Sequence, residues 1–142
     1  MEILERLSRR QLEALIAVRR GQTREKGSSL NFVARELRVR PPSALARLTT
    51  LEQLNLVARH RGKSRLTPKG EACVAEYQRH HRVAEHLFQR LGLPLEATHA
   101  AALEVDLALS HRTVQEICGA GGHPKVCPHG QPISPCSPRE RR

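Results

Sequence analysis

Two histidines and a glutamate are spaced in a way that could bind a metal ion. His81 and Glu85 are four residues apart within a helical pattern of apolar residues, so they would share one helix face. His99 follows a break at Gly92-Leu93-Pro94, and a helix that returns after this break would bring it against His81. Two imidazoles and one carboxylate suit a divalent transition ion. The spacing alone leaves the question open, because a His/Glu pair of this kind is usually surface decoration.

Cysteines and histidines also collect towards the C-terminus, at Cys118, His123, Cys127, His129 and Cys136. These side chains would suffice for a zinc ion, but the Cys-x8-Cys-x8-Cys spacing differs from the paired CxxC of common zinc ribbons. Zinc binding and simple packing therefore both remain possible for this segment.

Positive charge is concentrated in the first half of the chain. The 142 residues carry a formal net charge of +10. Residues 1–70 contain 16 Lys and Arg against 6 Asp and Glu, whereas residues 71–142 contain 8 of each. Such asymmetry is typical of a protein in which one lobe faces a polyanion, and nucleic acid is the expected partner. A membrane surface would require aromatic insertion residues, of which the chain has few.

No apolar run is long enough to span a bilayer, and the N-terminus lacks the features of a signal peptide. We therefore expect a cytoplasmic protein with reduced cysteines and no membrane partner. Cys73, between Ala72 and Val74, is expected to be a small core residue.

The basic half has the pattern of a winged helix-turn-helix. A helix is predicted from about Leu4 to Gly21, followed by a polar loop over 21–29 and a second helix capped by Ser29. A turn with two prolines opens a third helix, and residues 56–66 predict a basic hairpin with glycine at its tip. The third helix would enter the major groove and the hairpin would contact phosphates. The candidate DNA-binding residues are Arg40, Pro42, Ser43, Ala46, Arg47, Arg59, Arg61, Lys63 and Arg65.

The second half predicts a helical domain. A long helix is expected from Thr67 to about Leu91, a second from Leu95 to Leu109 and a short one from Ser110 to Ile117. The expected fold is therefore mainly α, with a DNA-binding domain over 1–70, a helical dimerisation and metal-binding domain over 71–118, and an irregular tail over 119–142.

Several motifs, in order, resemble one known family. They are the stretch from Leu66 to Gly70, Arg79-His80-His81-Arg82-Val83-Ala84-Glu85-His86-Leu87, Leu91-Gly92-Leu93, His99, Leu109-Ser110 and Cys127-Pro128-His129-Gly130-Gln131-Pro132-Ile133. Together they resemble the diphtheria toxin repressor and manganese transport regulator family. The resemblance implies a homodimeric, metal-activated winged-helix repressor that binds double-stranded operator DNA, takes no small-molecule substrate and controls manganese or iron uptake. Because Cys-Pro-His-Gly recurs in that family without a structural zinc, it favours a packed, non-ligating role for the tail cysteines.

The resemblance also assigns metal ligands. Its first metal position falls on His81, Glu85 and His99. Its second falls on Arg10, Leu103, Asp106 and Leu107, of which Asp106 alone could bind a cation, and Glu13 matches an acidic ligand of the manganese branch. The second site therefore looks degraded. A cation that also bound Glu13 would bridge the DNA-binding and dimerisation domains and fix the spacing of the two recognition helices.

Two functional hypotheses follow. In the first, one surviving site gates DNA binding, with manganese or iron(II) as the expected metal and zinc also possible. In the second, the protein is a metal-independent winged-helix regulator. A metalloenzyme is disfavoured, because the chain has no HExxH or nucleophile motif and little length to form a substrate pocket.

Overall fold

The computed structural model describes residues 2–136, which are mainly helical as predicted and form two compact units. The N-terminal unit comprises Arg6–Val74, and the C-terminal unit comprises the described residues of Met1–Glu5 and Ala75–Arg142. None of the described helices is long and apolar enough to cross a lipid bilayer.

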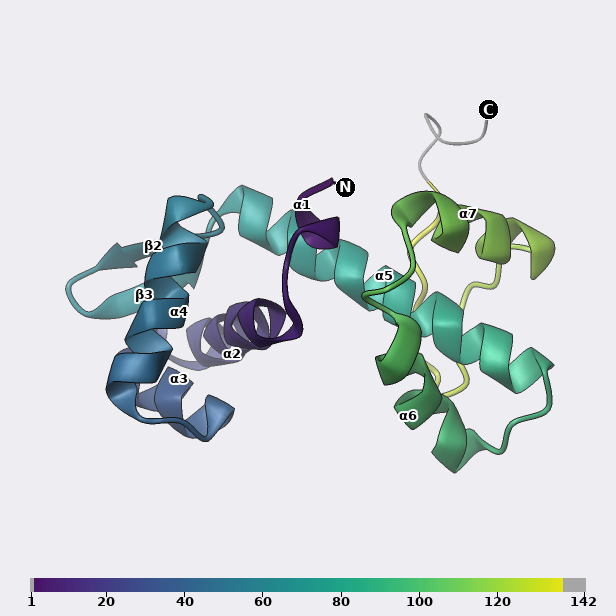
Figure 1. The fold of residues 1–142 in the computed structure, drawn as a ribbon, viewed down its shortest axis with the longest axis horizontal. Helices are drawn as coiled ribbons and strands as arrows, with labels where there is room; N and C mark the ends of the chain where they lie inside the picture. Colours follow the sequence, from purple (N-terminus) through teal and green to yellow (C-terminus); the bar gives the residue numbers. More distant parts are fainter. Residues whose placement is uncertain (1, 137–142) are drawn as a thin grey trace. The chain divides into compact units, whose positions relative to one another are not determined.

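The N-terminal unit contains α2, α3 and α4 and the hairpin of β2 and β3 (Figure 1). With β1 this hairpin forms a small antiparallel sheet of strand order β1-β3-β2. Its elements are α2 (Arg9–Glu25), β1 (Ser28–Ser29), α3 (Leu30–Leu37), α4 (Pro41–Gln53), β2 (Val57–His60) and β3 (Lys63–Leu66). Ser29 caps α3 by accepting from the Phe32 amide, and Pro41 occupies the first turn of α4, both as predicted. The core is aliphatic and includes the fully buried Leu12, Leu15, Val18, Val33, Leu48, Leu51 and Leu56.

The single first helix predicted from about Leu4 to Gly21 was wrong at both ends, because Leu4 lies in the separate helix α1 (Glu2–Glu5) and α2 continues to Glu25. Gly21 instead allows a close approach between α2 and the chain that follows. A Cβ atom at this position would lie 2.0 Å from the Ser28 Oγ, which donates a hydrogen bond of 2.6 Å to the Val18 carbonyl. The glycine is therefore required for tertiary packing, a role that its position in the sequence does not distinguish from helix termination.

The predicted hairpin is confirmed. Arg61 and Gly62 connect β2 to β3 with positive φ angles of 49° and 74°, as a two-residue turn matched to the twist of the strands requires. The pairing of β3 with β1 was not predicted, since β1 contains only Ser28 and Ser29.

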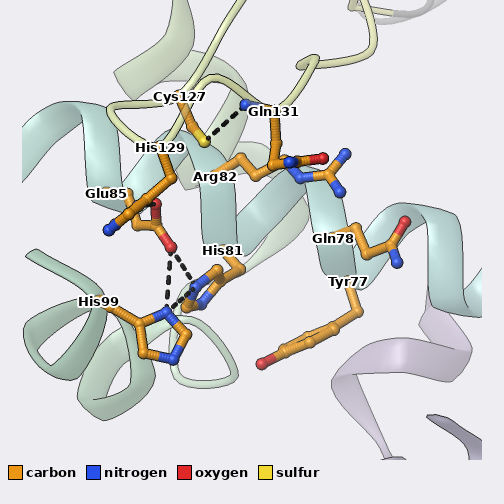
Figure 2. Close-up of a pocket in the computed structure, with 9 residues that line it drawn as sticks. All are labelled: Tyr77, Gln78, His81, Arg82, Glu85, His99, Cys127, His129 and Gln131. Carbon is orange, nitrogen blue, oxygen red and sulfur yellow. Dashed lines mark hydrogen bonds and ion pairs between the residues drawn. The ribbon is translucent and has the colours of Figure 1, made fainter.

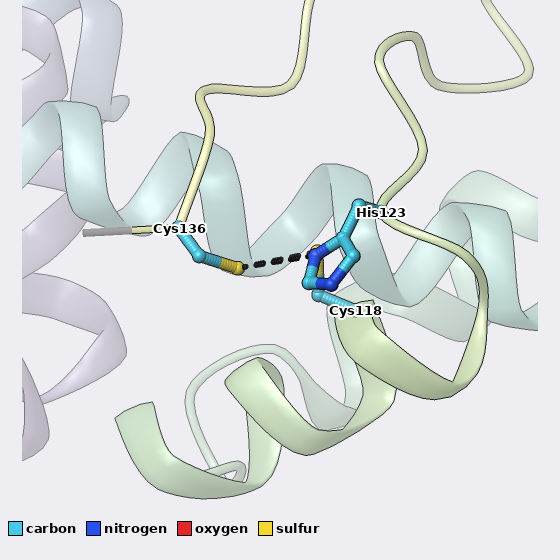
Figure 3. A group of neighbouring side chains, drawn as sticks. All are labelled: Cys118, His123 and Cys136. Atoms are coloured by element: carbon cyan, nitrogen blue, oxygen red, sulfur yellow. Dashed lines mark hydrogen bonds between the residues drawn. The ribbon is translucent and has the colours of Figure 1, made fainter. Parts of the chain in front are cut away.

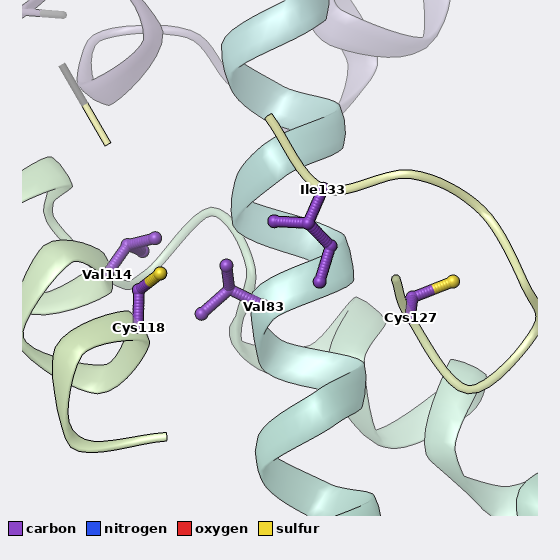
Figure 4. Close-up of a cluster of buried hydrophobic side chains, with 5 residues drawn as sticks. All are labelled: Val83, Val114, Cys118, Cys127 and Ile133. Carbon is purple, nitrogen blue, oxygen red and sulfur yellow. The ribbon is translucent and has the colours of Figure 1, made fainter. Parts of the chain in front are cut away.

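The C-terminal unit is built around the long helix α5 (Pro68–Arg90), which begins in the N-terminal unit. The other helices are α1 (Glu2–Glu5), α6 (Leu95–Val105) and α7 (His111–Ala120). Figure 4 shows its small apolar cluster, in which Val83 of α5 lies among Val114, Cys118, Cys127 and Ile133. Cys127 and Ile133 come from the segment after α7, so this segment completes the core.

The segment 121–136 is irregular, as predicted, but it is held against α5 by specific hydrogen bonds. Arg79 Nε donates to the Ser134 carbonyl at 3.1 Å, and Arg82 donates to the Pro132 carbonyl at 2.7 Å. An isolated bridge between Val126 and Pro132 closes the segment on itself. These contacts hold the segment beside α5 although it lacks regular secondary structure.

Candidate metal centre

Three polar side chains of the C-terminal unit converge from two helices (Figure 2). His81 and Glu85 lie one turn apart on α5, and His99 lies on α6 after the turn at Gly92. Gly92 has φ +94°, a conformation that favours glycine and allows the chain to turn back between the helices. The predicted meeting of His81 with His99 is thus present.

Their ligand atoms are as close together as those around one ion. His81 Nε2 lies 3.1 Å from His99 Nδ1, and His99 Nδ1 lies 3.2 Å from Glu85 Oε1. Atoms bound about 2.1 Å from a single ion are separated by ~3.0 Å at right angles and ~3.4 Å at tetrahedral angles. His81 Nε2 and Glu85 Oε1 are also in direct contact. The two distances to His99 Nδ1 therefore fit a shared cation, and His81 and Glu85 lie close enough to join it.

Asp106 lies behind the His81 imidazole rather than among these three ligand atoms. Its carboxylate is fully buried and accepts hydrogen bonds from His81 Nδ1 at 2.9 Å and from the Tyr77 hydroxyl at 2.8 Å. When the ring is neutral and Nδ1 carries its proton, the Nε2 lone pair faces Glu85 and His99. A carboxylate that orients a ligand histidine in this way is a common feature of metal sites and raises the basicity of the ligand.

His129 is a further residue of this site, and the sequence had suggested it only as one member of the tail cluster. Its Nδ1 lies 2.7 Å from Glu85 Oε2, the second oxygen of the carboxylate. Cys127 lies near the same carboxylate and forms a candidate ligand group with Glu85 and His129. The contact depends on the path of the 121–136 segment, which no periodicity of the sequence could reveal.

The surroundings favour the negative charge of Glu85, whose side chain is only 4% exposed. Burial by itself would raise the pKa of this carboxyl, but hydrogen bonds from His129 and His99 and the nearby charge of His81 lower it below its usual value. The carboxylate is thus ionised and flanked by imidazoles.

A cavity of about 260 Å³ opens beside these residues. His81, Glu85, His99 and His129 line it, together with Tyr77, Gln78, Arg82, Cys127 and Gln131. His99 is 58% exposed, whereas His81 is 12% exposed, so the group lies at the edge of the unit and is open to a small ion.

Comparisons with known proteins concern the same part of the chain. Residues 67–135 match the family model described as iron dependent repressor, metal binding and dimerisation domain. Residues 67–135 thus carry the metal-binding and dimerisation domain of the iron-dependent repressor family. The resemblance to the diphtheria toxin repressor and manganese transport regulator family is thereby confirmed, and the similar solved structures include metal-dependent transcriptional regulators. No curated protein matches the sequence.

Several solved structures are similar to this chain over nearly its whole length. A hypothetical protein from Sulfolobus solfataricus is 25% identical with a TM-score of 0.85, over 90% of this chain and 99% of that one. IdeR from T. acidophilum is 27% identical with a TM-score of 0.67, over 89% of this chain and 59% of that one. A manganese-dependent transcriptional repressor in complex with manganese is 26% identical with a TM-score of 0.67, over 88% and 63%. The chain thus spans about three fifths of the two regulators' length.

The DNA-binding residues predicted for the present chain lie in its N-terminal unit. Arg40, Pro42, Ser43 and Ala46 are exposed at the start of α4, and Arg47 is half-buried one turn further along. On the hairpin, Arg61, Lys63 and Arg65 are exposed and Arg59 is half-buried. Arg65 also donates to the Lys26 carbonyl. Glu13 is exposed on α2, and its role as a metal ligand stays a prediction.

A second polar cluster was missed from the sequence. His80 is buried and shares the Glu76 carboxylate with His111 of α7. Burial opposes ionisation of Glu76, but the His80 hydrogen bond and the charges of His111 and His80 outweigh it and lower its pKa to about 2. Both imidazoles point their nitrogens at one carboxylate oxygen, so hydrogen bonding accounts for this cluster without a metal.

Proposed function

We propose that this chain is a metal-responsive transcriptional repressor that binds operator DNA as a homodimer, with manganese or iron(II) as its activating metal. The proposal rests above all on one observation. When His81 is neutral and donates its Nδ1 proton to Asp106, its Nε2 lone pair faces the Glu85 carboxylate at contact distance. Two acceptors in contact repel each other unless a proton or a cation lies between them. The adjacent His99 nitrogen completes a set of ligands for a cation.

The nitrogen and oxygen donors of this site indicate which metals it would take. Imidazole and carboxylate ligands suit manganese and iron(II), although zinc binds such donors at least as tightly at equilibrium. The manganese-bound repressor among the similar structures is consistent with this choice. Control of manganese or iron homeostasis is therefore the function that we propose.

Features of the N-terminal unit support DNA binding. The start of α4 is exposed and carries Arg40 and Ser43, groups that can hydrogen-bond base edges in the major groove. Basic side chains lie on both strands of the hairpin and in its turn. They are Arg59, Arg61, Lys63 and Arg65. We propose that α3 and α4 form the helix-turn-helix and that the hairpin is its wing.

A homodimer is supported by exposed apolar surface on the unit that matches the dimerisation domain. Leu91 is 68% exposed at the end of α5, and Leu95 and Leu103 are 50% and 40% exposed on α6. Exposed large apolar side chains close together on a small unit are typical of an association surface. A homodimer would present two recognition helices to the DNA at a fixed spacing.

The alternative is a metal-independent regulator of the same fold, and the second metal position gives it some support. Leu103 and Leu107 cannot bind a cation there, Arg10 brings a positive charge, and Asp106 is engaged with His81 and Tyr77. We therefore assign a single regulatory site built on His81, Glu85 and His99.

The two functions are separated by a DNA-binding assay. A duplex selected from a random library by the metal-loaded protein would serve as the operator, and its affinity would be measured with chelator and after addition of Mn²⁺ or Fe²⁺. We expect a response on the order of a thousandfold, which corresponds to ~4 kcal/mol of coupling.

His81→Ala should abolish the response while leaving the protein folded. His86→Ala is the matched control, since His86 neighbours Glu85 on α5 but belongs to none of the candidate ligand groups. Equal affinity with and without metal would favour the metal-independent regulator.

A further inference from the structure

A separate set of ligands lies in the C-terminal unit, outside the His81 site. Cys118 is in the last turns of α7, His123 follows the end of this helix, and Cys136 lies 13 residues further along. Figure 3 shows the three side chains turned towards one point. The two thiols and one imidazole come from a helix and from both ends of the segment that follows it.

The distances between these three donors are those of a tetrahedral zinc site. The two sulfurs are 3.6 Å apart, and His123 Nδ1 lies 3.7 Å from the Cys118 sulfur and 3.6 Å from the Cys136 sulfur. Bonds of about 2.3 Å to sulfur and 2.0 Å to nitrogen at tetrahedral angles separate two sulfurs by ~3.8 Å and sulfur from nitrogen by ~3.5 Å. All three observed edges agree with these values to within about 0.2 Å.

Contacts other than those among the three donor atoms hold the ligand-bearing residues in place. The His123 amide donates to the Cys118 carbonyl at 2.8 Å, and His123 has φ +54°, so the helix ends in a turn that folds the imidazole back over the Cys118 thiol. Cys136 is held through the bond from Arg79 Nε to the Ser134 carbonyl and by burial of Ile133. The arrangement is therefore built by the fold and does not arise from the side chains alone.

Arg79 gives a second reason to expect thiolate ligands. Its guanidinium is nearly fully buried, and it donates to the Ser134 carbonyl, the Gln115 amide oxygen and the Cys136 sulfur, the last at 3.0 Å. None of these three acceptors carries a full negative charge unless the thiol is deprotonated. A buried cation is costly without a compensating charge, and a metal-bound thiolate supplies one.

We propose that Cys118, His123 and Cys136 bind a zinc ion that clamps the 121–136 segment onto α7. Binding converts two thiols to thiolates and releases two protons, with no change of oxidation state. Water completes the coordination from the adjacent cavity of about 490 Å³, which is lined by all three ligands. Thiolate sulfur selects zinc over manganese, so this site and the His81 site take different metals.

The clamp would also position the residues between its ligands. Cys127 and His129 lie within the closed segment, and His129 reaches Glu85. The sequence spacing had left zinc binding and packing both possible for these cysteines, and the family resemblance had favoured packing without metal. Packing does hold for the buried Cys127, whereas the turn after α7 brings Cys118 and Cys136 together across 17 intervening residues.

The test is a titration of the reduced, metal-free full-length protein with Co²⁺ under anaerobic conditions. Cobalt bound through sulfur gives a thiolate-to-metal charge-transfer absorption and intense tetrahedral ligand-field bands, which Zn²⁺ should abolish by displacement. Cys118→Ser and Cys136→Ser should lose the sulfur band. His123→Asn, at an exposed position that tolerates positive φ, should lower cobalt affinity by more than the ~10–100-fold typical of an outer-shell change.

Two controls make the outcome specific. Cys73→Ser, in the N-terminal unit, should leave the band unchanged, and so should His81→Ala, because the two sites share no ligand. The proposal is overturned if cobalt binds without a sulfur band. It is also overturned if protein quenched with an alkylating agent in cells contains a Cys118–Cys136 disulfide in place of two thiols. Neither result would bear on the proposed repressor function.

Discussion

Replacement of Asp106 by asparagine isolates the contribution of one buried charge to metal binding. Both hydrogen bonds to this residue, from His81 Nδ1 and from the Tyr77 hydroxyl, end on the same oxygen. An asparagine carbonyl placed there can accept both bonds, so the His81 ring keeps its orientation. What is lost is the negative charge 2.9 Å from the imidazole, which makes Nε2 a better donor to the metal.

The expected effect is a 10–100-fold loss of Mn²⁺ affinity, the range typical of partners behind a metal ligand. This loss corresponds to ~1.4–2.7 kcal/mol. Affinity would be measured by competition with a metallochromic chelator, and bound Mn²⁺ would be counted at saturation. The stoichiometry should be unchanged, because the three ligand atoms remain.

Tyr77→Phe is the matched control, since it removes one hydrogen bond to Asp106 and leaves the charge in place. It should reduce affinity less than tenfold and cost about 1 kcal/mol of stability. Two results would refute the reasoning. Unchanged Mn²⁺ affinity in Asp106→Asn would show that the carboxylate does not act on His81. Loss of one bound metal in the folded variant, equal to that of His81→Ala, would show that Asp106 is itself a ligand, as the family resemblance implies.

Three further predictions concern stability and DNA recognition. Because the pKa of Glu76 is lowered to about 2, its stabilising contribution is present above pH 4.5 and is lost as the pH falls towards 2. Glu76→Gln should therefore be less stable by about 1–2 kcal/mol near pH 5, after allowance for solvent screening, and the difference should vanish in acid unfolding curves near pH 2. Gly70→Ala should destabilise by roughly 1–3 kcal/mol in urea, since its Cβ would lie 2.1 Å from the Leu56 carbonyl oxygen, whereas Gly119→Ala has room and should be neutral. Arg47→Ala should weaken binding to the selected operator by about 1–3 kcal/mol more than binding to random DNA; equal losses on both would make Arg47 a phosphate contact.

Much of the fold could be read from local patterns. Apolar periodicity located α5 and α6, Ser29 and Pro41 marked helix starts, and Arg-Gly between two short arms predicted the hairpin. These signals are reliable because they reflect interactions within a few residues along the chain. Gly21 was wrongly predicted to end the helix. Its role depends on close contact with Ser28, which lies outside the helix and too far along the chain for a local pattern to show.

The candidate metal centre was partly predictable for the same reason. His81 and Glu85 share a helix face by spacing alone, and the turn at Gly92 directs α6 back towards them. The positions of Asp106 behind His81 and of His129 against Glu85 depend on contacts 25 and 44 residues apart in the chain. The periodicity of a sequence cannot reveal contacts between residues so far apart in the chain.

The sequence by itself determined the charge asymmetry, the helical framework and the pair of ligands on α5, since each follows from composition or from neighbours within one or two turns. Only the tertiary structure decided which polar groups meet. It placed a buried carboxylate behind one imidazole and joined Glu76 to two histidines. It also brought Cys118, His123 and Cys136 to one point. These groups meet because packing of the apolar cluster on α5 fixes where the irregular segment must run, and that packing involves the whole unit at once.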